Sequence, residues 1–193
     1  MSHLITKIPW TTGKKIGLVT STLALSLLIP NLSTTVNAFE VGENETVFLA
    51  APRLTRAATT NLSPNGPSIY HFTIEVPENA DEALQAITVS QRDNPVYINF
   101  ALDKSNAFMG DSFAGGPNLA LADIGGDLSV NPNDITVVFD EPVQPGETVT
   151  VRLRAKRNPA RGGIYLFGVT AFPEGENSSG LYIGSKSLQF YSY

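Results

Sequence analysis

Most of the chain after residue 67 alternates apolar and polar residues with a period of two. In IYHFTIEV (residues 69–76), one set of alternate positions holds Tyr70, Phe72, Ile74 and Val76, and polar residues fill most of the other set. Strict alternation is typical of a β-strand with one face in a core and one face in water. The same pattern occurs in residues 84–91, 96–102, 134–140 and 147–156.

Three other segments have different patterns. GIYLFGVTAF (Gly163–Phe172) is apolar in both alternating sets, which predicts an interior strand of a sheet. GLYIGSKSLQFY (residues 180–191) predicts a last strand or a bulged pair, with a kink at Gly184. PENADEALQ (Pro77–Gln85) predicts a short helical turn, because proline is favoured at a helix start and acidic residues in the first turn.

Prolines and glycines separate these segments at short intervals, and Pro145-Gly146 is typical of a tight turn. Seven to eight short strands with this spacing predict an all-β fold, namely an antiparallel immunoglobulin-like β-sandwich. The predicted sandwich domain covers residues 68–193. Residues 39–67 are less regular, and we expect them to form an N-terminal arm that lies across the sandwich, with one edge strand at Val47–Ala50.

The first 38 residues have the pattern of an export signal. Three lysines and no acid flank or precede an apolar stretch, Ile16–Ile29, and small residues at positions 36 and 38 suit a signal peptidase. This predicts a signal peptide in residues 1–38 that is cleaved after Ala38. The alternative is a membrane anchor, but 14 helical residues rise only about 21 Å, against about 30 Å for a hydrocarbon core. We therefore expect a periplasmic or extracellular protein with no membrane span after cleavage.

Composition narrows the class of protein further. The chain has no cysteine, so the core must hold without disulfides, as suits a bacterial envelope protein. Without residues 1–38 it has 10 basic and 18 acidic residues, a net charge of −8. This acidic balance disfavours nucleic acid as a partner.

The catalytic residue types are scarce. After residue 38 the chain has one histidine, His71, which lies in the outward register of its segment and is expected to be a surface or inter-strand polar residue. There is no cysteine and no G-x-S-x-G motif, so no catalytic residue is assigned and the sequence predicts a protein that is not an enzyme. A small hydrolase using paired carboxylates stays a third hypothesis, because the spacing of the acids singles out no pair.

The residues also limit which metals could bind. Copper and zinc sites need His, Cys or Met, and after residue 38 the chain offers only His71 and Met109. No cofactor is predicted, but calcium is left open because it needs only oxygen ligands. The candidate calcium ligands are Asp123, Asp127, Asn131 and Asp134. The alternative is that these residues only form Asx turns around a short strand.

Half of the basic residues that follow residue 38 lie within ten positions. They are Arg152, Arg154, Lys156, Arg157 and Arg161. If the two segments around them pair as a hairpin, they form one patch that could bind an anion, an acidic glycan or an acidic surface of an envelope protein. The alternative is an edge strand whose charges prevent aggregation, neutralised by cross-strand acids such as Glu147.

Four segments of the sequence resemble a known protein family. They are PRLTRAATT (Pro52–Thr60), YHFTIEVPENADEALQAITVSQ (Tyr70–Gln91), VQPGETVTVRLRAKRNP (Val143–Pro159) and GGIYLFGVTAFPEGE (Gly162–Glu176). The chain resembles an uncharacterised set of exported cyanobacterial proteins, domain of unknown function 2808. The resemblance implies a cyanobacterial cell-envelope protein and brings no activity and no site residues.

Besides the small hydrolase, these observations lead to two functional hypotheses. The first is a non-enzymatic binding or structural module of the envelope, with the basic hairpin as its contact surface. The alternative is a calcium-dependent or calcium-stabilised glycan-binding domain that uses the segment from Asp123 to Asp134.

Overall fold

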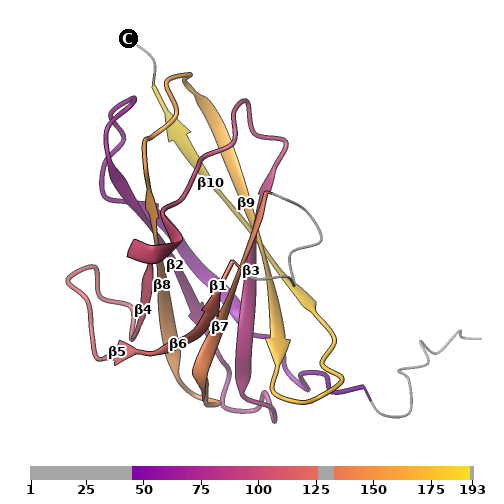
Figure 1. Cartoon of the computed structure of the whole chain (residues 1–193). Coiled ribbons are helices and arrows are strands. Elements are labelled where there is room, and N and C mark those ends of the chain that lie inside the picture. Colours follow the sequence, from indigo (N-terminus) through magenta and orange to yellow (C-terminus); the bar gives the residue numbers. More distant parts are fainter. Residues whose placement is uncertain (1–44, 126–132, 192–193) are drawn as a thin grey trace, which may run out of the picture. The chain divides into compact units, whose positions relative to one another are not determined.

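A computed structural model describes residues 45–125 and 133–191 of the chain. Two five-stranded antiparallel sheets face one another (Figure 1). The first sheet has the order β1-β2-β8-β4-β5 and the second β10-β9-β3-β7-β6. The strands are β1 (Arg53–Thr59), β2 (Ser68–Glu75), β3 (Leu84–Arg92), β4 (Asn106–Met109), β5 (Asn118–Leu119), β6 (Leu121–Ile124), β7 (Asp134–Val143), β8 (Thr148–Ala155), β9 (Gly163–Pro173) and β10 (Leu181–Phe190), with one 3-10 helix, η1 (Leu102–Lys104).

The predicted immunoglobulin-like β-sandwich is confirmed. β1, β2 and β8 are neighbours in one sheet, and β10, β9 and β3 are neighbours in the other. This corresponds to the A-B-E and G-F-C strand orders of immunoglobulin-like domains. The described residues form ten strands, where the sequence predicts seven to eight. The excess comes largely from the short β5 and β6, in a segment without clear alternation.

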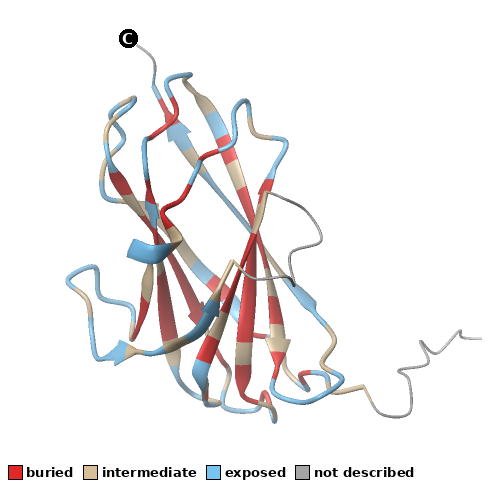
Figure 2. Cartoon of the chain, in the orientation of Figure 1, coloured by how far each residue is buried: buried red, intermediate tan, exposed pale blue. Residues whose placement is uncertain are grey.

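Aromatic side chains from both sheets fill the centre of the sandwich. Tyr70 and Phe72 of β2 lie 5.7 and 5.5 Å from the Phe167 ring of β9. Tyr165 meets Phe190 of β10 edge-on at 5.3 Å. All five side chains are buried, and burial of each contributes about 1.5–3 kcal/mol to stability. Figure 2 shows the buried residues running along the strands, while the connections between them are largely exposed.

The helical turn predicted for Pro77–Gln85 is wrong. The segment contains a turn closed by the Ala80 N–H, which donates to the Pro77 carbonyl at 3.0 Å, and β3 begins at Leu84. Asp81 has φ 71°, a left-handed conformation that cannot continue a helix. The Ala80 carbonyl instead accepts the Leu49 N–H, so the turn is fixed by a distant segment.

The sandwich begins before residue 68. β1 lies within the segment expected to be an arm, and it pairs along β2 as the edge strand of the first sheet. Pro52, which has no N–H to donate, lies just before this strand. No strand forms at Val47–Ala50, although Phe48 is buried. The predicted signal peptide lies outside the described residues, and no helix in the described part is long and apolar enough to cross a membrane.

The C-terminal strands have the arrangement that the sequence predicts. β9 is an interior strand, hydrogen-bonded to β10 on one side and β3 on the other. Its outer face is only half-buried, at Leu166, Thr170 and Phe172. β10 is an edge strand whose register shifts between Tyr182 and Gly184, and Gly184 has φ 118°. The predicted kink is therefore a β-bulge that needs glycine.

Candidate functional site

The basic segment does not form the predicted hairpin. β8 pairs with β2 and β4 in the first sheet, whereas β9 pairs with β10 and β3 in the second, so residues 156–162 cross between sheets. A connection of seven residues could close a hairpin within one sheet or cross from one sheet to the other. The sequence alone therefore does not distinguish the two. β8 is also the middle strand of its sheet. Protection of an exposed sheet edge therefore does not explain its arginines.

The alternation of β8 places its arginines on the outer face of the first sheet. Leu153 and Ala155 are buried in the core, so Arg152 and Arg154 point the other way. Arg152 is half-buried and Arg154 is exposed. Lys156 follows in the same register and is exposed.

A shallow pocket of about 360 Å³ lies over the outer face of β8. Its lining combines three cations with one carboxylate, two small polar side chains and one aliphatic side chain: Arg152, Arg154, Lys104, Asp103, Ser105, Asn106 and Ile69. The pocket can therefore offer several positive donors to one acidic group beside an apolar surface.

Backbone contacts fix η1 beside these arginines. The Ala101 N–H donates to the Arg154 carbonyl at 2.7 Å, and the Arg154 N–H donates to Ser105 Oγ at 3.1 Å. Ser105 Oγ in turn donates to the Ala101 carbonyl at 2.9 Å. Because both ends of η1 are tied to β8, Asp103 and Lys104 have a defined place next to the pocket.

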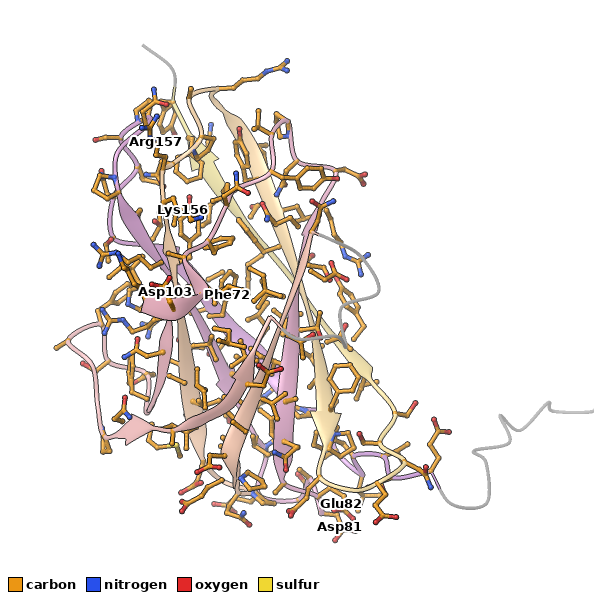
Figure 3. All side chains as sticks on the ribbon, viewed as in Figure 1. Phe72, Asp81, Glu82, Asp103, Lys156 and Arg157 are labelled. Carbon is orange, nitrogen blue, oxygen red and sulfur yellow. The ribbon has the colours of Figure 1, made fainter. Side chains whose placement is uncertain are left out.

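A second pocket, of about 350 Å³, lies at the end of β8. It is lined by Val96, Tyr97, Ile98, Asn99, Lys156, Arg157, Asn158, Pro159 and Ala160. Tyr97 and Val96 are nearly half exposed, so this pocket places two cations beside an aromatic ring and an aliphatic side chain. Figure 3 shows Arg157, Lys156 and Asp103 following one another along one side of the sandwich.

Asn158 anchors the segment that carries Lys156 and Arg157. Its side chain is buried, and its Oδ1 accepts the Tyr70 hydroxyl at 2.8 Å. Its Nδ2 donates to the carbonyls of Asn61 and Ser63, at 2.7 and 3.1 Å. These bonds join the β1–β2 and β8–β9 connections, which keeps the two cations in place.

Arg161 lines neither of these two pockets. Its carbonyl accepts the hydroxyl of Tyr165 at 2.8 Å, four residues further on at the start of β9. This is the tyrosine corner of immunoglobulin-like folds, a structural feature of the E–F connection. We therefore define the basic face as Lys104, Arg152, Arg154, Lys156 and Arg157.

The cations of the basic face form no ion pair in the described ranges, although the Asp103 carboxylate lines the same pocket as Arg152 and Arg154. The single ion pair found in those ranges joins Arg53 to Glu75 at 2.7 Å, and both side chains are well exposed. Glu147, expected to neutralise the cations, instead accepts the Gln144 N–H at 3.0 Å in the turn before β8. A neutralising role for Glu147 is therefore wrong, because it lies at the opposite end of that strand.

His71 is buried rather than at the surface, although it does lie in the outward register. It is 2% exposed, because the segment from Gly110 to Pro117 folds over this part of the sheet. The Phe113 ring lies 4.9 Å from the imidazole and also stacks on the Arg56 guanidinium at 4.6 Å. The sequence gives no local signal for this cover, since it comes from the distant β4–β5 connection.

The surroundings of His71 favour its neutral form. Burial, followed by the charges of Arg152 and Arg56, lowers the pKa of His71 from 6.5 to about 4. The backbone of Ile69 acts weakly in the opposite direction, without a hydrogen bond of normal geometry. An uncharged histidine between two arginines is not a general base with a suitable pKa for neutral pH.

The described residues include only two of the four predicted calcium ligands, Asp123 and Asp134. Asp127 and Asn131 lie outside the described residues. Asp123 pairs opposite Val138, four residues along β7 from Asp134, or about 13 Å at the usual rise per residue. The two positions are therefore not neighbours on the sheet. Nowhere in residues 45–125 and 133–191 do three or more acidic or histidine side chains gather as a metal site would require.

The chain matches the family described as "Protein of unknown function (DUF2808)" over residues 45–190. It belongs to this family. The match covers both sheets of the sandwich, so the resemblance inferred from the sequence is confirmed, whereas an origin in cyanobacteria is not tested by it. A comparison with curated proteins gives no match.

Solved structures of similar shape are distant in sequence. A C-terminal fragment of the major pilin GBS80 of Streptococcus agalactiae is 10% identical, with a TM-score of 0.46, over 74% of this chain and 56% of that one. BslA, a bacterial hydrophobin, is 14% identical, with a TM-score of 0.44, over 74% and 100%. The collagen-binding subdomain of Enterococcus faecalis surface protein ACE is 10% identical, with a TM-score of 0.41, over 70% and 94%. Likenesses of this strength carry no information about a ligand.

Proposed function

We propose that this protein is a non-enzymatic binding module of the cell envelope that holds an acidic glycan through its basic face. The observation that carries the proposal is the outer surface of β8 and of the connection after it. There, two pockets are lined by Arg152 and Arg154 and by Lys156 and Arg157, and none of these cations is ion-paired with an acid among the described residues.

The residue types of the basic face suit acidic sugars. A guanidinium group can donate two parallel hydrogen bonds to a carboxylate or sulfate, while a lysine acts as a point charge. Ile69 in the first pocket and Tyr97 in the second supply apolar surface for the faces of sugar rings. A chain with regularly spaced acidic groups could engage both pockets together, which multiplies weak contacts.

The proposed location is the periplasm or the cell exterior. Three observations support it: the predicted signal peptide in residues 1–38, the absence of cysteine, and the resemblance to exported proteins. Acidic polysaccharides and acidic surfaces of envelope proteins are the partners that this location would offer.

A structural role through self-association is a second candidate, because charge is separated along the sandwich. In Figure 3, Asp81 and Glu82 lie at the end opposite Arg157 and Lys156. Hydrogen bonds between the β2–β3, β7–β8 and β9–β10 connections bring further acids to that end, among them Glu78, Glu147 and Glu174. The acidic end of one copy is complementary to the basic face of another, which would give head-to-tail assembly.

The test is binding of an acidic polysaccharide to the chain lacking residues 1–38. The triple variant Arg154→Glu, Lys156→Glu, Arg157→Glu should weaken binding at least ten-fold, which is about 1.4 kcal/mol. A double reversal outside the basic face, Arg161→Glu with Lys186→Glu, is the control and should change binding far less. Binding should also decrease as salt is raised.

Three results would contradict or redirect the proposal. Salt-insensitive binding that is unchanged in the triple variant would overturn the basic face as the contact surface. A gain in polysaccharide affinity that requires calcium would instead support the calcium-dependent alternative. Concentration-dependent sedimentation at low salt, without polysaccharide binding, would favour the structural role.

A further inference from the structure

Four buried nitrogen atoms that have no hydrogen-bond partner among the described residues lie together on the outer face of the first sheet. They are Nε of Arg56, Nε of Arg152, and Nδ1 and Nε2 of His71. The three side chains come from neighbouring strands, β1, β2 and β8. His71 lies directly opposite Arg152, and Arg56 is opposite Thr73, one position further along the same face of β2.

Such a group of unpaired nitrogens is unusual for a folded protein. Buried polar atoms nearly always have a hydrogen-bond partner, and each exception calls for an explanation. The Nη2 atom of Arg56 does donate, to the Asp111 carbonyl and, at 3.4 Å, to Thr73 Oγ1. Neither Arg56 nor Arg152 is ion-paired with a carboxylate in the part of the chain that the structure describes.

The charges around His71 all have the same sign. Arg56 approaches the imidazole from β1 and Arg152 approaches it from β8, and their positive charges disfavour its protonation. The covering segment contributes the uncharged Phe113 ring and, through Asp111, a backbone carbonyl. An anion is the ligand that would attract both guanidinium groups and accept hydrogen bonds from all three side chains.

Two features of the surface lie next to these nitrogens, an open pocket on one side and a half-exposed ring on the other. Arg152 is shared, since it lies opposite His71 and also lines the pocket of about 360 Å³. On the other side, the Phe113 ring covers both His71 and Arg56 but is itself half exposed. The covering segment begins at Gly110, whose carbonyl accepts Thr150 Oγ1 at 2.7 Å, and it contains glycines with φ 94° and 101°.

We propose that Arg56, His71 and Arg152 form a binding site for one oxyanion group, a sulfate or a carboxylate, of the acidic glycan that the basic face attracts. The glycan as the source of this group rests on the proposed function, whereas the site itself rests on the unpaired nitrogens. The Nε–H groups of the two arginines and one N–H of the imidazole donate to the anion, and the Phe113 ring covers it.

The experiment uses the chain lacking residues 1–38, because residues 40–193 form one compact unit. His71 is then the single histidine, so its ring ¹⁵N signals are assigned without ambiguity. Sodium sulfate and sodium acetate are titrated separately against sodium chloride at equal ionic strength. We expect a saturable shift of the His71 signals with sulfate or acetate and not with chloride, and the stronger of the two identifies the group.

The pKa of His71, measured with and without the anion, supplies a second test. A histidine with only a structural role would show no change in its pKa when the anion is added. An anion beside the imidazole favours its protonated form, so a bound anion should raise the pKa of His71 above its value in chloride. Arg152→Gln should weaken sulfate binding at least ten-fold, because a charged donor is removed. Arg161→Gln, outside the basic face and both pockets, is the control and should change it less than two-fold.

The variant His71→Phe separates a loss of sulfate binding from a loss of folding. It fills the same buried space without polar atoms, so it should remain folded but bind sulfate more weakly. Unchanged His71 signals and pKa at saturating sulfate and acetate would overturn the proposal, as would equal sulfate affinity in Arg152→Gln. If the chain binds the polysaccharide but fails the sulfate test, only this site is ruled out. If it binds sulfate but not the polysaccharide, only the proposed function is ruled out.

Discussion

His71 of β2 and Arg152 of β8 lie directly opposite one another on the outer face of the first sheet, and in the described part of the chain neither imidazole nitrogen nor the arginine Nε has a hydrogen-bond partner. Side chains at directly opposed positions lie close together, so the arginine charge acts strongly on the imidazole. The pair therefore joins the buried cluster beneath Phe113 to the open pocket around Arg154.

Stability should decrease between pH 6.5 and pH 4 because of His71. In the unfolded chain this histidine gains a proton near pH 6.5, whereas in the folded chain its pKa is lowered to about 4. Between these values the unfolded state binds more protons, so the free energy of unfolding falls as the pH falls and the loss is complete below pH 4. Because only the segment around Phe113 separates the ring from water, screening by water reduces the effect, and we expect a loss of unfolding free energy on the order of 2 kcal/mol.

Urea unfolding at several pH values measures this effect. Carboxylates also titrate near the lower end of this range, so the informative quantity is the difference between the wild-type chain and His71→Phe. That difference should grow as the pH falls from 6.5 to 4. Parallel pH profiles for the two chains would contradict the prediction.

The hydroxyl of Tyr165 should contribute to stability through the tyrosine corner. Tyr165→Phe removes the hydrogen bond to the Arg161 carbonyl and keeps the buried ring, so it should cost about 1 kcal/mol of unfolding free energy. Tyr182→Phe is the matched control, because Tyr182 is nearly half exposed and its hydroxyl makes no hydrogen bond within residues 45–125 and 133–191. Equal melting temperatures for the two variants would show that the corner does not stabilise this fold.

The alternation of the sequence predicted much of the fold and little of the site. Period two correctly placed Phe72 and Leu153 in the core, and Arg152 and Arg154 on the other face, because side-chain direction along a strand is a local property. It could not assign β8 and β9 to different sheets, since strand pairing is decided by contacts between distant segments. The burial of His71 was missed for the same reason: Phe113 reaches it from another connection.

Asn158 should couple stability to ligand binding. Asn158→Ala removes three hydrogen bonds and leaves the Tyr70 hydroxyl unpaired inside the core, which should cost about 3 kcal/mol. The freed segment carries Lys156 and Arg157, so affinity for an acidic polysaccharide should also fall by several-fold. Asn177→Ala, at an exposed position in the β9–β10 connection, should leave both quantities close to wild type. Calorimetry of unfolding and of binding on the same samples measures both.

The cover over His71 should depend on the absence of a side chain at Gly116. A Cβ atom there would lie 2.1 Å from the Met109 carbonyl oxygen and 3.1 Å from the Phe108 ring. Gly116→Ala must therefore displace either the covering segment or β4. We expect a loss of about 1–3 kcal/mol of stability. We also expect a rise in the pKa of His71 from about 4 towards 6.5 as water reaches the ring.

Ala114→Ser, at an exposed position of the same segment, is the control and should change neither the stability nor the pKa of His71. Histidine titration by NMR distinguishes the outcomes, because a destabilised chain with an unchanged His71 pKa would mean that this segment is not what keeps the imidazole neutral.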